Sequence, residues 1–334
     1  MRFVDSHPSA TVFHTREWLA CLSRTYGYDV AGIVRTASSG EISSALPLCT
    51  VKSWLTGTRT ISVPFADHCE PLGWSPADMA TVRAELESLR ERTGSKYVEL
   101  RPIATDLLAP QPENELIPSA SYRYHTLDLD KDVDTLFARL HVSCIQRKIR
   151  RAEASNLNYE TGRSDEMLRR FYSLMVKTRR RHGLFPQPLA WFCNLASVFG
   201  EKLVIHLASK GQQPVAALIT IQHQDKLVYK YGASDDSQHA LGGMPFLFWR
   251  AILHGKSVGA KQFDLGRTDP EGVGLSTFKE RLGAQSRNLN YYRFPITPEK
   301  SFLPSHARRV MTLATQLPDS VCSIAGRMLY RHAG

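Results

Sequence analysis

The order of predicted elements repeats along the chain, and this repeat limits the fold more than any other feature. Each copy has a β-hairpin, then a helix that ends at a glycine, then a strand. The hairpin, helix, glycine and strand are 28–51, 76–92, Gly94 and 96–101 in the first copy, and 202–222, 245–254, Gly259 and 261–267 in the second. Similar helix-to-strand junctions can arise by chance, but the shared order favours a duplicated α/β unit with mixed strands.

The length of 334 residues favours two domains. Three prolines (Pro110, Pro112 and Pro118) mark the stretch 104–120 as a linker. We therefore expect a first domain over 1–120 and a second over 121–300. The remaining residues, 301–334, contain two amphipathic segments, 307–317 and 321–332, and this tail either packs on the body or lies on a membrane surface.

The composition indicates a folded protein, since hydrophobic residues make up 43% and charged residues 22% of the chain. We find no apolar run of the ~18 residues that a membrane helix needs, and no signal peptide at the start. The six cysteines lie far apart, without a C-x-x-C pair or a nearby histidine at metal-ligand spacing. The sequence thus predicts a cytoplasmic protein with reduced thiols and no bound metal.

Positive charge is concentrated in one segment. The formal net charge is +10, and residues 131–183 hold thirteen Lys and Arg against six acids, a surplus of seven. An anionic partner follows, either RNA, a phosphorylated cofactor or an anionic lipid. The segment is a basic wall beside an anion-binding cleft or, equally, a pair of solvated helix faces.

Two places in the sequence offer groups for acid–base or anion chemistry. Asp67 and His68 follow a short strand, where a general base is often held, although such a pair also forms turns. Gly242 and Gly243 precede a helix with Pro245 in its first turn, and the free N–H groups at such a start can bind phosphate. A plain helix cap is the competing interpretation of these glycines.

Strand tyrosines are candidates for a substrate groove. Tyr229, Tyr231, Tyr291 and Tyr292 lie in predicted strands, where aromatic side chains line a groove or, more often, belong to a core.

The densest group of motifs lies between 264 and 292. It contains Asp264-Leu265-Gly266-Arg267, Gly274-Leu275, Phe278-Lys279 and a tyrosine pair, and further motifs lie at 63–72, 146–152 and 214–217. In this order they resemble the Fem-type aminoacyltransferases and the related acyltransferases of the GNAT superfamily that have a FemAB/BioF2-like domain. The resemblance covers about 10–295 and is closest to shorter members, because the helical arm of some cell-wall members has no counterpart here.

The resemblance implies an α/β fold of tandem GNAT-like domains, each a mixed, mostly antiparallel sheet flanked by helices, with the motif in the second. It implies an N-acyl or aminoacyl transferase with no tightly bound cofactor. The donor would be acyl-CoA or aminoacyl-tRNA, and the acceptor an amine on a cell-envelope precursor or a small molecule. Lys279 would be an exposed cleft lysine that stabilises the oxyanion. Arg147, Arg267 and Phe278 would contact substrate.

A different class of function stays open at this point. The same basic, duplicated fold would also suit an RNA- or polysaccharide-binding module without catalysis. A membrane contact through the tail would place the protein at the inner face of the membrane.

Overall fold

The computed structural model describes residues 2–104, 118–295 and 318–332. The chain divides into two compact units. The first is drawn from Met1–Arg123, Asn288–Phe302 and Met328–Gly334, and the second from Tyr124–Arg287 and Leu303–Arg327. Residues 288–294, at the end of the strand Gln285–Phe294, therefore belong to the first unit. The predicted second domain, 121–300, includes them.

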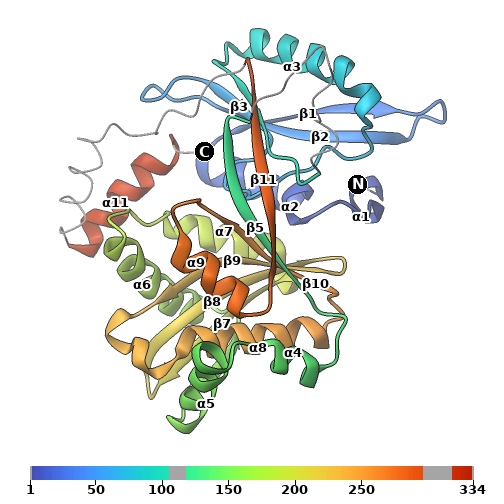
Figure 1. The fold of residues 1–334 in the computed structure, drawn as a ribbon. Helices are drawn as coiled ribbons and strands as arrows, with labels where there is room; N and C mark the ends of the chain where they lie inside the picture. Colours follow the sequence, from blue (N-terminus) through green and yellow to red (C-terminus); the bar gives the residue numbers. More distant parts are fainter. Residues whose placement is uncertain (1, 105–117, 296–317, 333–334) are drawn as a thin grey trace. The chain divides into compact units, whose positions relative to one another are not determined.

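The first unit is a mixed sheet with helices on both faces. Figure 1 shows α3 on one face of β1 and β2, and α2 on the other. The strand order is β1-β2-β3-β4-β11, antiparallel except for β3 and β4. The elements are α1 Arg2–Ser6, α2 Arg16–Tyr26, β1 Asp29–Thr36, β2 Ile42–Val51, β3 Arg59–Ile61, α3 Met79–Thr93, β4 Val98–Leu100 and β11 Gln285–Phe294.

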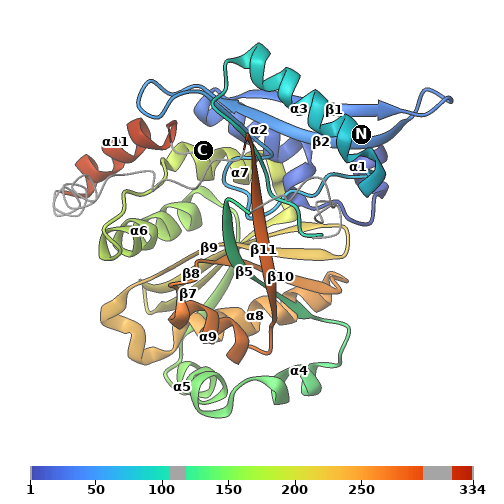
Figure 2. The ribbon, with the colours of Figure 1, turned by 45° about the horizontal axis from the view of Figure 1, so that its top comes forward.

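The second unit has the strand order β5-β10-β9-β8-β7-β6, in which β9 and β10 are parallel. Figure 2 shows α6 and α7 on one face of β7, β8 and β9, and α8, with α5 beyond it, on the other. The elements are β5 Ala120–Asp128, α4 Val133–Arg139, α5 Arg147–Ala154, β6 Asn158–Gly162, α6 Asp165–Arg181, α7 Leu189–Phe199, β7 Leu203–Lys210, β8 Gln213–His223, β9 Lys226–Ser234, α8 Gly243–Ser257, β10 Gln262–Thr268, α9 Val273–Arg281 and α11 Asp319–Tyr330. Residues 120–123 of β5 and 328–330 of α11 belong to the first unit.

The two units repeat one another, so the predicted α/β duplication is confirmed. Each unit contains an antiparallel hairpin, β1–β2 or β7–β8, and a third strand, β3 or β9, pairs antiparallel with that hairpin. The third strand then pairs in parallel with a fourth, β4 or β10, and a helix, α3 or α8, connects the two along the chain. The helices α3 and α8 are followed by Gly94 and Gly259, with φ of 62° and 75°. This left-handed conformation ends a helix and costs glycine little, which explains why both junctions carry one.

The chain forms these elements for local reasons that the sequence shows. Thr15 caps α2 by accepting a hydrogen bond from the Trp18 amide, and Ser164 caps α6 in the same way. Helical apolar spacing runs from Val133 to Ile149, but the helix is interrupted in the structure. A wider turn over Val142–Gln146 separates α4 from α5, and the side chain of Gln146 donates to the carbonyls of Phe137 and Leu140, which close the end of α4.

Part of the predicted tail and linker lies outside the described residues, namely 105–117 and the segment 307–317. The predicted segment 321–332 forms α11. Within the second unit Cys322 is fully buried, and Gly326 lies so close to the carbonyl oxygen of Pro186 that an added Cβ would lie 2.0 Å from that oxygen. This part of the tail thus packs on the body, and a membrane contact stays a prediction.

Candidate functional site

Strands β9 and β10 separate after a short paired stretch. Their parallel register joins Gln262 to Lys226 and ends with Asp264 opposite Val228, although both strands continue. Across the other edge of β9, the register with β8 shifts so that Lys230 is an extra residue, a β-bulge. A bulge bends its strand and interrupts pairing, which explains why β9 leaves β10 and a space opens beside it.

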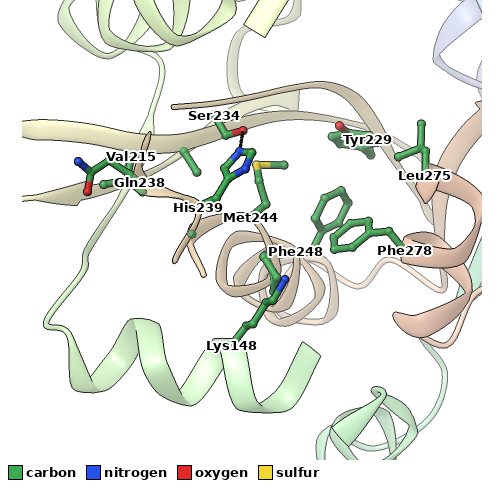
Figure 3. A pocket seen from close by; sticks show the side chains of 13 residues that line it. Lys148, Val215, Tyr229, Ser234, Gln238, His239, Met244, Phe248, Leu275 and Phe278 are labelled. Atoms are coloured by element: carbon green, nitrogen blue, oxygen red, sulfur yellow. Dashed lines mark hydrogen bonds between the residues drawn. The ribbon is translucent and has the colours of Figure 1, made fainter. Parts of the chain in front are cut away.

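A pocket of about 300 Å³ occupies the second unit beside this bend. The volume is at the lower end of the ~300–1,000 Å³ typical of small-molecule sites. Figure 3 shows side chains from β8, β9, α5, α8 and α9 directed into it. The lining residues are Lys148, Val215, Ala216, Tyr229, Ser234, Gln238, His239, Gly243, Met244, Pro245, Phe248, Leu275 and Phe278.

One end of the pocket is an aromatic wall. The ring centroids of Tyr229 and Phe248 are 4.8 Å apart, and those of Phe248 and Phe278 are 5.3 Å apart. Figure 3 shows Leu275 at the same end. Gly232 makes room for this wall, since an added Cβ would lie 2.1 Å from the Tyr229 hydroxyl. This end can hold an apolar group.

Two polar side chains face the pocket near the end of β9. The Ser234 hydroxyl and Nε2 of His239 are 3.0 Å apart. Ser234 is held by Thr178 of α6, whose hydroxyl accepts from the Ser234 amide at 2.9 Å and donates to its carbonyl at 3.1 Å. An imidazole can accept a proton, and a hydroxyl can donate to a carbonyl oxygen that gains charge.

The loop that follows is fixed at its first residue. Asp235 is almost buried, and its Oδ2 lies 2.6 Å from Nζ of Lys177. The Lys177 hydrogen bond, helped by the hydroxyl of Ser237, holds the pKa of Asp235 below its usual value. Asp235 also accepts from the Ser237 amide and so starts the turn over Asp236–Leu241. The loop is therefore anchored on α6 by a charged pair.

The start of α8 lies against α5. Gly242 has a φ of 76°, and an added Cβ would lie 2.4 Å from the Lys148 carbonyl oxygen. Gly243 lines the pocket and fits against Val215 and Ala216, each about 3.0 Å from an added Cβ. The first N–H groups of a helix have no intrahelical acceptor and favour anions. Of the predicted glycine pair, Gly243 thus lines the pocket, together with the exposed Lys148 side chain, whereas Gly242, the residue before it, packs against the Lys148 backbone.

Lys279 is placed differently from our expectation of an exposed cleft lysine, which is wrong. It is 2% exposed and is not among the pocket-lining residues. Its Nζ donates to the carbonyls of Gly266 and Arg267 and to the hydroxyl of Thr268, at 3.1, 3.0 and 2.9 Å. The ammonium thus joins α9 to the end of β10, because the strand's last carbonyls need donors. Its role as an oxyanion donor stays an untested prediction.

The predicted base and one tyrosine lie in the first unit. His68 is fully buried, with its ring edge to face against Phe13 at 5.1 Å between centroids. The hydroxyl of Tyr291 donates to the carbonyl of Asp67 at 2.6 Å, and Arg101 stacks on the Tyr291 ring. Asp67, His68 and Tyr291 are thus brought together, as parts of the first unit's packing, and their roles in the reaction remain predictions.

The remaining predicted residues are divided. Tyr229 and Phe278 line the pocket. Tyr231 does not, because its ring packs on Phe192 and its hydroxyl accepts from Nε1 of Trp191 at 2.7 Å, which makes it part of the core. Arg147 is exposed on α5, and Arg267 is partly buried at the end of β10; neither lines the pocket. Tyr292, in the first unit, belongs to a hydrophobic core cluster.

Sequence reasoning missed several pocket residues, above all Ser234, His239 and Lys148. Their signals were present. Gln238 and His239 precede the glycine pair, and Lys148 belongs to the basic segment. The bulge in β9 could not be predicted from the sequence, and this register shift decides which residues of the strand face α8.

In 2–104, 118–295 and 318–332, no group of three or more His, Cys, Asp and Glu side chains is placed to hold a metal ion. In that same part of the chain, none of the helices combines the length and the apolar character needed to cross a bilayer.

Comparisons with known proteins agree with this geometry. Residues 141–280, which include α5, α8 and every lining residue of the pocket, match the family model for the acetyltransferase (GNAT) domain. No curated protein sequence matches the chain. Among solved structures, the fold is similar to FemX, with a TM-score of 0.64 at 16% identity, covering 86% of this chain and 94% of that one.

Two further structures share the fold. The L-PGS of Bacillus licheniformis aligns with a TM-score of 0.53 at 13% identity, over 91% of this chain and 96% of that one. A tandem GNAT protein from the clavulanic acid biosynthesis pathway aligns with a TM-score of 0.50 at 12% identity, over 86% and 90%. The predicted α/β fold of tandem GNAT-like domains is confirmed. Residues 141–280 thus form a GNAT-type acetyltransferase domain, and the fold of the chain is similar to that of FemX, as its motifs indicated.

Proposed function

We propose that the pocket of the second unit binds the activated acyl donor, an acyl thioester such as acyl-CoA or an aminoacyl ester on tRNA, and that the acyl group passes to an amine. The observation that carries the proposal is the meeting of three features at one cavity: the α8 start at Gly243, the Lys148 cation and an apolar wall. Phosphate and acyl group would then lie at different parts of one site.

The basic helix α5 supports the position of the phosphate. Lys148 lines the pocket, and Arg151, one turn away on the helix, donates to the Ala240 carbonyl in the loop before α8. A cation and the N-terminus of a helix both favour an anion. The basic segment predicted from the sequence thus contributes at least one cation to the pocket.

The reaction needs few groups from the protein. The amine nitrogen forms a bond to the acyl carbon, the bond to sulfur or to the ester oxygen breaks, and the leaving group takes a proton. Charge develops on the carbonyl oxygen meanwhile, and Ser234 offers a hydroxyl donor in the pocket. His239 offers a nitrogen that can take the proton of the amine.

The acceptor in this proposal is the amine of a cell-envelope precursor or of a small molecule. Its support is the fold shared with FemX and with L-PGS, taken together with the exposed apolar side chains of α11 that would suit a membrane surface. Among them Ile324 is 57% and Met328 64% exposed.

Replacement of Lys148 tests the donor site. Lys148→Ala should weaken binding of acyl-CoA about tenfold, since a hydrogen bond to a charged group contributes about 1.5–3 kcal/mol. Titration calorimetry with acyl-CoA pools and, separately, filter retention of aminoacyl-tRNA would measure it. Arg150→Ala, on the same helix but outside the pocket lining, is the matched control and should bind within twofold of the unchanged protein, a margin of about 0.4 kcal/mol.

Two results would contradict the proposal. One is the absence of any donor binding by the unchanged protein, and the other is equal affinity in Lys148→Ala. Retention of aminoacyl-tRNA that falls steeply with salt would identify charged tRNA as the donor. The expected slope of log K against the logarithm of the salt concentration is roughly −0.7 to −0.9 for each phosphate neutralised.

A further inference from the structure

The charges around the pocket are of one sign. Lys148 and His239 are the lining side chains that can be positive, and none of the thirteen lining residues, all within the described chain, is acidic. An aminoacyl group carries an α-ammonium, which needs a carboxylate or several acceptors when it leaves water. The pocket offers it a neighbouring cation instead.

Asp235 is the acidic residue next in sequence to a lining residue, and its carboxylate already has hydrogen-bond partners. Asp235 follows the lining residue Ser234, but its carboxylate accepts from Lys177 and from Ser237 and is only 7% exposed. It is absent from the lining. To pair with a ligand, Asp235 would have to give up the contacts that anchor the loop on α6.

The opposite end of the pocket is apolar and suits a hydrocarbon group. Tyr229, Phe248 and Phe278 form a continuous series of ring contacts, and Leu275 and Met244 complete the apolar surface around them (Figure 3). Burial of methyl and methylene groups against such a surface is favourable, whereas burial of an unpaired ammonium is costly.

We propose that the acyl group transferred by this protein is uncharged and apolar, carried as a thioester, and that the pocket selects against aminoacyl groups. The inference rests on the proposed function, because it assumes that the donor occupies this pocket. The specificity comes from the aromatic wall together with the absence of a carboxylate among the lining residues.

A matched pair of thioesters tests the inference. Butyryl-CoA and β-alanyl-CoA have acyl chains of equal length and differ at the end, where a methyl group replaces an ammonium. Calorimetric titration at pH 7 should give butyryl-CoA an affinity at least ~30-fold higher, since the ammonium would be buried without a partner. Free CoA is titrated alongside to report the phosphate-bearing part alone.

A reversal variant sharpens the test. Leu275 is a lining residue that is 48% exposed, so Leu275→Glu adds a carboxylate to the apolar end without loss of a buried side chain. It should narrow the preference for butyryl-CoA by about tenfold or more, as expected for a new charged hydrogen bond. Val273→Glu, on the same helix, 67% exposed and outside the lining, is the control and should keep the original preference.

The possible outcomes distinguish the proposed selectivity for an apolar acyl group from the proposed binding of the donor in this pocket. Binding of free CoA together with equal affinities for the two thioesters would overturn the inference and leave the donor site in place. An unchanged preference in Leu275→Glu would also overturn it. If free CoA and both thioesters fail to bind while aminoacyl-tRNA is retained, the acyl-CoA donor and the inference both fall.

Discussion

The segments 264–284 and 234–245 of the second unit contain similar residues and use them in opposite ways. Both have glycines, a hydroxyl side chain and a side chain that can carry positive charge. In 264–284 the buried Lys279 side chain hydrogen-bonds to its own segment, at Gly266 and Thr268. In 234–245, Ser234 and His239 face a cavity, and the anchoring is done by α6.

The difference shows what a sequence motif can and cannot indicate. The 264–284 segment looked most like a site, whereas the 234–245 segment looked most like a plain helix start. A charged group that is buried among its acceptors, as the Lys279 ammonium is, serves the fold. Ser234 and His239 hydrogen-bond to each other but line a cavity, so a ligand can reach them. That distinction depends on packing, which the spacing of residues in the sequence does not give.

The largest effect should come from Lys279→Ala. Two carbonyls and a hydroxyl lose their donor in a buried place, so the free energy of unfolding should fall by about 2–5 kcal/mol. Urea unfolding followed by circular dichroism measures it. Arg281→Ala, exposed on the same helix, should stay within about 0.5 kcal/mol.

Equal stability of Lys279→Ala and the unchanged protein would break the comparison. It would mean that the Lys279 ammonium is dispensable to the fold, and the oxyanion role implied by the family resemblance would regain its standing. A loss of turnover that exceeds the loss of folded protein would point the same way.

A smaller effect on stability, together with a loss of donor affinity, should follow from Gly242→Ala. The new methyl group would meet the Lys148 carbonyl at 2.4 Å, and the left-handed backbone itself costs a non-glycine residue about 1–3 kcal/mol. Unfolding and calorimetric titration should both change. Gly259→Ala shares the conformation, with a φ of 75° and no atom within 4 Å of the added Cβ, and should lose stability alone.

If both glycine variants lose stability equally and bind the donor equally well, then the contact between α5 and the start of α8 has no part in the site. The 234–245 segment would in that case be a helix start like any other.

The smallest effect should come from the anchor of the loop. Lys177→Met removes the partner of Asp235, and because Lys177 is half exposed the loss of stability at pH 7 should be below about 1 kcal/mol. The pKa of Asp235 is lowered in the fold, so the pair stabilises above the ordinary pKa of 3.8 and loses its effect as the pH falls through the lowered value.

Unfolding measured from pH 7 to pH 3 checks this prediction. The difference between Lys177→Met and the unchanged protein should shrink below about pH 4, since protonated Asp235 no longer attracts the ammonium. Arg169→Met, exposed on the same helix, should show no such dependence. A difference that is constant with pH would show that Lys177 acts by packing and not by charge.

Much of the fold could be predicted from the sequence because its signals are local. Thr15 caps a helix, Gly94 and Gly259 end two others, and the apolar alternation gave both hairpins. The break at Val142–Gln146 could not be predicted, because the apolar spacing continues through it and the side chain of Gln146 replaces backbone donors at the end of α4.

Less of the site could be predicted from the sequence, because the site depends on contacts between elements and not on local signals. Gly243, Tyr229 and Phe278 were predicted and line the pocket. Tyr231 was predicted to share a groove with Tyr229, and in a regular strand residues two apart do share a face, but the bulge at Lys230 separates the two. The exposure of Lys279 was implied by the resemblance of its motif, whereas in the structure its side chain is buried against acceptors from another element, at the end of β10.

The bulge in β9 changes the meaning of odd and even positions within a single strand. Before it, the odd-numbered Leu227 and Tyr229 face α8; after it, the even-numbered Gly232 and Ser234 do, and Tyr231 has crossed to the side of α7. Homologous sequences aligned across this strand without regard to Lys230 would therefore compare pocket-lining positions in one protein with core positions in another. Variation at Tyr231 reports on core packing, whereas variation at Tyr229 and Ser234 reports on the lining of the pocket.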